Sequence, residues 1–326
     1  MKAAIVALTR GYPDNRLLYE KVIKRNKSIF NNINKKRKVP ADIILFHEGN
    51  ISLEDQNYIQ SYSPESINFV DVKKYFVKNN LELKGEERFP LGYRQMCRFN
   101  MFHIWDEVRD YSHILRVDED IEIMNIDPYA FEYMEKKNIS YMTGRFTKDI
   151  HRLTNKTLPY YLIENTNMNV QKIYNHKNPY TNLFATSVDF WLDESNYSIL
   201  EKIALSDDQL INRWGDHTVH GIILNHNQEK IKLFPKLEYK HISHSDLVVK
   251  NNFIRNLTIN SRYNPVSIKE GFYTKVKIKI KSKIKSTNKF DFENHWVELS
   301  FVTFLIIKNS LKRVLLKLYY NLSMLC

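Results

Sequence analysis

Apolar runs of strand length alternate with helix-type segments through the first 145 residues of this chain. The strand-type runs lie at residues 2–8, 41–46, 67–72, 113–117 and 139–142. This alternation predicts an α/β fold, in which helices cover both faces of one sheet. In such sheets ligands bind outside the carboxyl ends of the strands. The residues that follow each run are therefore the first place to look for a functional site.

The segments between these runs carry helix signals. Asp14 is expected to cap a helix, and Ser52 with Asp55 resembles a capping box. Residues 93–108 have helical periodicity, and Pro128 is suited to the first turn of a further helix. The apolar face of the first helix is expected to consist of Leu18, Val22, Ile29 and Ile33. In the second half, residues 200–210 are expected to be helical, whereas 145–185 and 235–265 are expected to be irregular.

Composition limits the kind of protein and the kind of site. A chain of 326 residues with 43% hydrophobic content can form one large domain or two small ones. Glycine is scarce and no Gly-rich phosphate loop is present, so a metal and side chains would have to hold any nucleotide phosphates. With only two cysteines, Cys97 and Cys326, a disulfide framework is not expected. With no signal peptide and no apolar run of about 18 to 20 residues, the expected location is cytoplasmic.

The positive charge of the chain is concentrated near its end. The formal net charge is +12, and basic residues far outnumber acidic ones in 271–326. We therefore divide the chain into a domain at 1–270 and a basic amphipathic extension at 271–326. Such an extension can bind the anionic cytoplasmic face of a membrane, or it can dock on the domain. Nucleic acid is not expected as a partner, because the rest of the chain is close to neutral.

Two carboxylates one residue apart follow the strand at 113–117. Asp118 and Asp120 flank Glu119 at the expected carboxyl edge of the sheet. Oxygen ligands suit Mn²⁺ or Mg²⁺, which such pairs often share with a substrate diphosphate. The alternative is a solvated turn, because the Asp-x-Asp pattern alone is common.

Three segments in register then indicate a family. They are Tyr93-Arg94-Gln95-Met96-Cys97-Arg98-Phe99, Arg116-Val117-Asp118-Glu119-Asp120 and Arg213-Trp214-Gly215-Asp216-His217-Thr218-Val219-His220. They resemble the fungal α-1,2-mannosyltransferases of glycosyltransferase family 15, which read Tyr-Arg-His-Met-Cys-Arg-Phe, Arg-Val-Glu-Pro-Asp and Arg-Trp-Gly-Asp-Ala-Pro-Val-His. The resemblance covers roughly residues 2–245. It implies a GT-A-type fold with a single mixed central sheet, a GDP-mannose donor, Mn²⁺ (or Mg²⁺), and retention of the anomeric configuration. The implied acceptor is a hydroxyl of a glycan or a lipid-linked glycan.

The resemblance also assigns roles to residues of the metal and donor sites. Asp118 and Asp120 would ligate the metal that bridges the donor diphosphate, and His220 would be the distant nitrogen ligand. Asp118 would thereby also contact the donor. Arg10 follows the first strand, where the family has a donor-contacting arginine, and an ordinary loop arginine is the alternative. His217 has no counterpart in the family motif and is expected at the surface.

The helix at 93–108 would add donor contacts. Arg94 and Arg98 share one helix face, where a guanidinium could bind phosphate bidentately, and Tyr93 could contact the donor. The alternative is an amphipathic helix whose arginines lie on the solvated side.

The catalytic carboxylates are harder to assign. Asp216 is expected either to contact a sugar hydroxyl or metal ligand, or to be a helix N-cap after Gly215. Asp189 is the acid nearest to the family's candidate nucleophile, a glutamate, with Asp193 and Glu194 as further choices.

Two other functions remain open. The fold could use a UDP-sugar donor, or it could be a decayed transferase fold that acts as a non-catalytic adaptor for membranes or polyanions.

Overall fold

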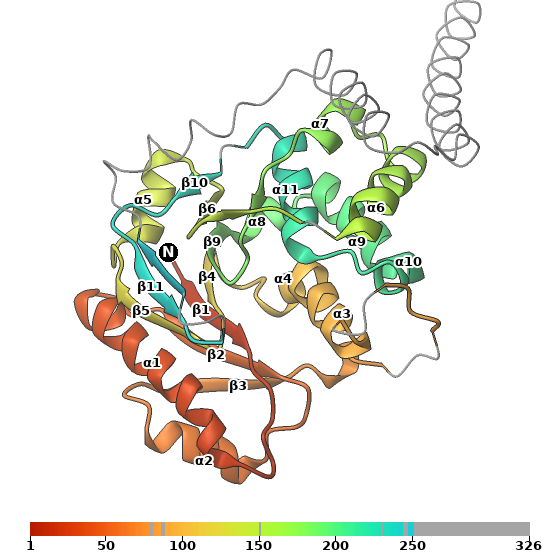
Figure 1. The fold of residues 1–326 in the computed structure, drawn as a ribbon. Helices are drawn as coiled ribbons and strands as arrows, with labels where there is room; N and C mark the ends of the chain where they lie inside the picture. Colours follow the sequence, from red (N-terminus) through yellow and green to blue (C-terminus); the bar gives the residue numbers. More distant parts are fainter. Residues whose placement is uncertain (78–80, 86–88, 150, 230, 244–246, 251–326) are drawn as a thin grey trace, which may run out of the picture. The chain divides into compact units, whose positions relative to one another are not determined.

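The computed structural model describes residues 1–77, 81–85, 89–149, 151–229, 231–243 and 247–250 (Figure 1). The chain divides into two units, Met1–Asn264 and Pro265–Cys326, and every described residue lies in the first. The predicted boundary at 270/271 and the basic extension lie outside the described residues. Within the described part, no helix is long and apolar enough to cross a membrane.

A central mixed sheet organises the described residues (Figure 1). Its seven described strands, in spatial order, are β10 (Lys232–Leu233), β6 (Tyr141–Thr143), β9 (Leu183–Ser187), β4 (His113–Val117), β1 (Ala3–Leu8), β2 (Asp42–His47) and β3 (Ile67–Asp71). Strands β4, β1, β2 and β3 are parallel, and β9 runs antiparallel to β4 and β6. This arrangement confirms the predicted α/β class with one mixed central sheet.

Two smaller sheets accompany the central one. One joins β5 (Ile121–Asn125), β11 (Glu238–His241) and β12 (Leu247–Lys250), and the other pairs β7 (Phe146–Thr147) with β8 (Asn178–Pro179). The antiparallel β5–β11 pair places His241 opposite Ile121, directly after the acidic loop. The expectation of loops at 235–265 is therefore wrong for β11 and β12, because strand pairing with distant β5 orders them.

Helices cover both faces of the central sheet, as Figure 1 shows. The helices are α1 (Glu20–Asn32), α2 (Leu53–Ser61), α3 (Leu91–Arg98), α4 (Ile104–Glu107), α5 (Ala130–Lys137), α6 (Arg152–Asn165), α7 (Val170–Tyr174), α8 (Val188–Leu192), α9 (Glu194–Leu205), α10 (Asp207–Ile211) and α11 (Asp216–His226). Short 3-10 turns lie at η1 (Arg16–Tyr19), η2 (Asn34–Lys36) and η3 (Lys73–Tyr75), and a π-helical turn, η4 (Phe99–His103), joins α3 to α4.

Strand alternation builds a separate core on each face of the sheet. Ile5 of β1 packs in one core with α1 and α5, whereas Val6 packs in the other with the helices around α4 and α11. Of the predicted α1 face, Val22, Ile29 and Ile33 are buried. The fourth member, Leu18, lies in η1 and is 39% exposed.

The helix ends show which of the predicted N-caps form. Ser52 caps α2 as predicted, since its Oγ accepts a hydrogen bond from the backbone N–H of Asp55 at 3.1 Å. Asp14 does not cap, because Asn15 accepts from the N–H of Leu17 and caps η1 instead. The expectation of an irregular stretch at 145–185 is wrong for α6, which forms around Pro159 because one of its faces is buried in the core.

Candidate functional site

The acidic loop lies at the carboxyl edge of the parallel strands. Because β1 and β4 are parallel and in register from Ala3 opposite His113, the residues after both strands meet at one edge (Figure 1). Residues 118–120 follow β4 there, and residues 9–12 follow β1. This is the edge at which α/β sheets bind ligands, and it agrees with the position predicted for Asp118 and Asp120.

Arg116 joins the first carboxylate of the loop to α11. Its Nε donates to Oδ1 of Asp118 at 2.9 Å, and its Nη1 donates to Oδ2 of Asp216 at 2.8 Å. Burial raises the pKa of Asp118 above its ordinary value, and the Arg116 charge only partly opposes this. The Asp118 side chain is still 29% exposed, whereas that of Asp216 is 7% exposed. Asp118 is thus the carboxylate of this pair that is open to a ligand.

Asp120 faces a histidine that comes from β11. Nε2 of His241 lies 3.3 Å from Oδ2 of Asp120, and both side chains are largely buried. On the other side of the ring, Nδ1 lies 3.3 Å from Nδ2 of Asn182 and 3.4 Å from the hydroxyl of Tyr180. Burial alone would raise the pKa of Asp120, but hydrogen bonds from His241 and Ser243 lower it to about 2. An ionised carboxylate and an imidazole nitrogen therefore lie within hydrogen-bonding distance of each other.

This donor set fits a divalent cation in part. Carboxylate oxygen and imidazole nitrogen both suit Mn²⁺. Among the described residues, no group of three or more His, Cys, Asp or Glu is arranged as a complete metal site. Asp120 and His241, with Asp118 nearby, would therefore need further oxygen ligands, and a diphosphate with water supplies these.

His220 does not lie with these carboxylates. Its ring packs 4.4 Å from that of Trp191 and 5.5 Å from that of Phe184, measured between centroids. Nδ1 lies 3.3 Å from the hydroxyl of Tyr141, and burial lowers the pKa of His220 to about 3. The structure thus places His220 in an aromatic cluster, and the imidazole beside Asp120 is that of His241.

The third motif forms a buried ionic network around Asp149. Arg213 Nη1 donates to both carboxylate oxygens of Asp149 at 3.1 Å, and Thr218 Oγ1 donates to one of them at 3.0 Å. His217 Nε2 lies 3.4 Å from Asp149 Oδ2, and its Nδ1 lies 3.9 Å from Asp216 Oδ1. Although burial opposes it, these two carboxylates raise the pKa of His217 to about 9. The surface position expected for His217 is wrong, because its ring lies between Asp149 and Asp216 and only 15% of its side chain is exposed.

Asp216 is the first residue of α11, and Gly215 is its N-cap, so the alternative of an Asp216 N-cap is also wrong. Although burial alone would raise its pKa, hydrogen bonding from His217 and the charge of Arg116 hold it well below its usual range. Asp216 is therefore an ionised, buried carboxylate, and the Arg116 side chain connects it to Asp118.

The arginines of α3 bind the protein's own backbone. Arg94 donates to the carbonyl oxygens of Leu210 and Ile211, each at 2.7 Å, and also to those of Phe89 and Lys84. Arg98 donates to the side chain of Gln209 at 2.9 Å and to the carbonyl of Ser206 at 3.1 Å. Neither is brought to the acidic loop, so both predicted phosphate contacts are corrected to structural roles.

Tyr93 lies beside the third motif. Its hydroxyl accepts a hydrogen bond from Arg213 Nη2 at 3.4 Å. The structure therefore groups Tyr93 with the Asp149 network and not with Asp120.

Asp189 lies at the opposite edge of the sheet. Antiparallel pairing sets Leu183 against Val117 and Ser187 against His113, so β9 carries the chain away from the acidic loop. Asp189 follows β9 and is exposed. Because a strand rises about 3.4 Å per residue, the length of β9 separates Asp189 from that loop by roughly 15 Å. Asp193 caps α9 by accepting from the N–H groups of Ser195 and Asn196, and Glu194 begins that helix. The predicted nucleophile is therefore far from the cation site, and the two further choices belong to the start of α9.

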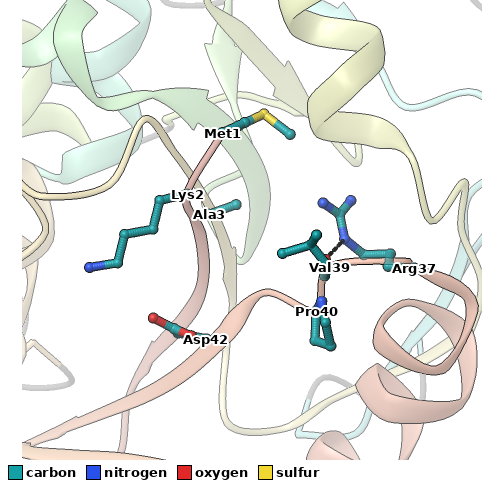
Figure 2. A pocket seen from close by; sticks show the side chains of 7 residues that line it. All are labelled: Met1, Lys2, Ala3, Arg37, Val39, Pro40 and Asp42. Atoms are coloured by element: carbon teal, nitrogen blue, oxygen red, sulfur yellow. Dashed lines mark hydrogen bonds between the residues drawn. The ribbon is translucent and has the colours of Figure 1, made fainter.

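A hollow lies at the other end of the strands, and Figure 2 shows the side chains that line it. Its lining residues are Met1, Lys2, Ala3, Arg37, Val39, Pro40 and Asp42. Arg37 Nε donates to the carbonyl of Val39 at 3.1 Å, and its Nη2 pairs with Glu132. Because the hollow lies at the amino end of β1, it is not at the ligand-binding edge.

Sequence reasoning missed several residues of the site. His241 could have been found from the alternation in Glu238-Tyr239-Lys240-His241, which is typical of a strand with Tyr239 and His241 on its buried face. Asn182, Tyr180 and Asp149 carried no such local signal.

The fold and the acidic edge together define the class, which is the GT-A type of glycosyltransferase fold. Core-mannan synthase A from Aspergillus fumigatus, solved in an Mn/GDP form, superposes with a TM-score of 0.61 at 19% sequence identity. The superposition covers 74% of this chain and 75% of that one. This likeness confirms the predicted fold.

Two curated fungal proteins are similar to this chain in sequence. Glycolipid 2-alpha-mannosyltransferase 2 from Candida albicans is 31% identical over 175 residues, which cover 46% of this chain but only 37% of that protein. O-glycoside alpha-1,2-mannosyltransferase omh1 from Schizosaccharomyces pombe is 24% identical over 285 residues, covering 74% of this chain and 69% of that protein. No family model matches the chain. The relatives confirm the predicted resemblance to fungal mannosyltransferases.

Proposed function

We propose that this protein is a metal-dependent, retaining glycosyltransferase that transfers mannose from GDP-mannose to a hydroxyl of a glycan or glycolipid. The observation that carries the proposal is the Asp120–His241 pair beside Asp118, at the ligand-binding edge of a GT-A-type fold. The mannosyltransferase names of the relatives support the sugar, and the Mn/GDP form of the Aspergillus structure supports the cation and the base.

Three side chains would hold the cation with the donor diphosphate. Asp120 and His241 supply an ionised oxygen and a nitrogen, and the partly exposed Asp118 supplies a further oxygen. Tyr180 and Asn182 orient the His241 ring by contacting its far nitrogen, as partners of metal-bound histidines do. A bound Mn²⁺ would neutralise the charge that develops on the leaving diphosphate.

Retention requires either a nucleophile on the protein or attack from the face that the diphosphate leaves. The position of Asp189 argues against it as the nucleophile. Asp216 remains ionised next to Arg116 and is linked through it to Asp118. We assign Asp216 the role of holding Arg116, and through it Asp118, in position. We favour attack by the acceptor hydroxyl from the face that the diphosphate leaves.

The test is a transfer assay with the full chain, Mn²⁺ and a mannoside acceptor, offering GDP-mannose, UDP-glucose and UDP-galactose in parallel. The proposal predicts a product one hexose heavier with GDP-mannose alone, with an α linkage by NMR. Transfer from a UDP-sugar would overturn the assigned donor. Neither transfer nor donor hydrolysis by folded protein would overturn the enzymatic proposal.

We further propose that residues 271–326 bring the enzyme to anionic membranes, which supports a lipid-linked acceptor. The support is the basic composition of that segment. Sedimentation with vesicles that contain phosphatidylserine, compared with neutral vesicles, tests it, and equal sedimentation with both would contradict it.

A further inference from the structure

The middle residue of the acidic loop, Glu119, holds the segment that follows β1. Its Oε2 accepts a hydrogen bond from the backbone N–H of Arg10 at 3.0 Å. Its Oε1 accepts from Arg10 Nε at 3.2 Å and from the hydroxyl of Tyr12 at 3.0 Å. The Glu119 side chain is only 10% exposed. One buried carboxylate thus binds three donors from residues 10–12.

The same segment is held from its other side. A Cβ atom on Gly11 would lie 2.0 Å from the carbonyl oxygen of Asn50, so the backbone approaches the residues after β2 too closely for a side chain. The backbone N–H of Tyr12 donates to the hydroxyl of Tyr19 at 2.9 Å. The segment therefore has one well-defined conformation, and Glu119 supplies its contacts with the acidic loop.

Glu119 leaves part of the Arg10 guanidinium open. The Arg10 side chain is 74% exposed, and among the described residues neither of its terminal amino groups has a hydrogen-bond partner. Because Arg10 Nε is bonded to Glu119, the residue directly before Asp120, the guanidinium lies beside the acidic loop that carries the proposed cation site. A guanidinium that is anchored through Nε keeps two amino groups free to bind phosphate oxygens.

We infer that Glu119 is a positioning residue that fixes Arg10 to bind the diphosphate of the nucleotide donor. This inference rests on the proposed function and adds a residue to its donor site. Anchoring Arg10 before the donor arrives reduces the side-chain entropy lost on binding. Glu119 itself touches no donor atom in this account, so it acts only through Arg10 and only on ligands that carry phosphates.

Calorimetric titration of the full chain with GDP and with guanosine, each with Mn²⁺, tests the inference. The proteins are the wild type, Glu119→Gln, Arg10→Ala and the double variant. Glutamine removes the charge that anchors Arg10, so GDP binding is expected to weaken by about tenfold, near the lower end of the contribution of one charge-assisted hydrogen bond. Guanosine binding is expected to stay unchanged, and the double variant is expected to bind GDP no more weakly than Arg10→Ala.

Two controls keep the outcome clear. Glu122→Gln removes a carboxylate from nearby β5 and is expected to leave GDP binding unchanged. Tyr12→Phe deletes one of the three hydrogen bonds, and should weaken GDP binding in the same direction but less, even if Glu119→Gln folds poorly.

Several results would overturn the inference. They are unchanged or tighter GDP binding by Glu119→Gln, an equal loss of guanosine binding, or a loss that adds to that of Arg10→Ala. Failure of the wild type to bind GDP with Mn²⁺ would instead overturn the proposed function together with this inference.

Discussion

Nε2 of His241 lies 3.3 Å from Oδ2 of Asp120, although one residue ends strand β11 and the other immediately precedes β5. The antiparallel pairing of these strands sets His241 opposite Ile121 and so creates the contact. An interaction between segments distant in sequence therefore supplies the nitrogen donor of the candidate cation site.

The first prediction follows from this pair. His241→Ala should weaken binding of Mn²⁺ by at least about tenfold in the presence of GDP, because the nitrogen donor is lost. The fraction of free Mn²⁺, measured by electron paramagnetic resonance, reports this directly. His220→Phe is the matched control, because it keeps a ring in the aromatic core and should bind Mn²⁺ as the wild type does. The opposite pattern would restore the metal role first predicted for His220.

The second prediction concerns the position of Asp189. Because Asp189 lies at the far edge of the sheet, Asp189→Asn should keep mannosyl transfer within about twofold of the wild type, as for a group remote from the reacting atoms. Initial rates at saturating donor measure this, with Asp120→Asn as an inactive comparison. A fall of two orders of magnitude or more would show that Asp189 takes part in the reaction.

The third prediction separates structural from donor-binding arginines. Arg94→Ala removes hydrogen bonds from a buried guanidinium to four backbone carbonyls, so the free energy of unfolding should fall by about 3 kcal/mol. Urea denaturation measures this loss. Arg109→Ala, which removes an exposed arginine paired with Asp106, should cost less than about 1 kcal/mol. If Arg94→Ala were as stable as Arg109→Ala but bound GDP poorly, the donor contact would be correct after all.

The fourth prediction uses the charge on His217. Its pKa is raised to about 9 in the folded protein, against about 6.5 in the unfolded chain, so folding takes up a proton between these values. The stabilisation is complete below about pH 6.5 and is lost as the pH rises through about 9, at up to about 1.4 kcal/mol per pH unit. Urea titrations at intervals from pH 6 to 9.5 should show this slope in the wild type and a shallower one in His217→Ala. Parallel profiles would mean that His217 is neutral in the folded protein.

The sequence predicted the edge of the sheet at which the site lies, but only part of the site. Asp118 and Asp120 follow a strand directly, so their position depended on local pattern alone. His220 and His241 could not be told apart in this way, because the ring environment of His220 depends on Trp191 and Phe184 from other segments. Arg94 illustrates the same limit, since its carbonyl partners at 210 and 211 lie on another helix.

The most direct test of the central claim is calorimetric titration of the full chain with GDP-mannose, in Mn²⁺ and in EDTA, alongside Asp120→Ala. We expect GDP-mannose to bind only with Mn²⁺ and not to bind the variant, and we expect no binding of UDP-sugars. Binding of GDP-mannose that persists in EDTA or in Asp120→Ala, or no binding by folded wild-type protein, would contradict it.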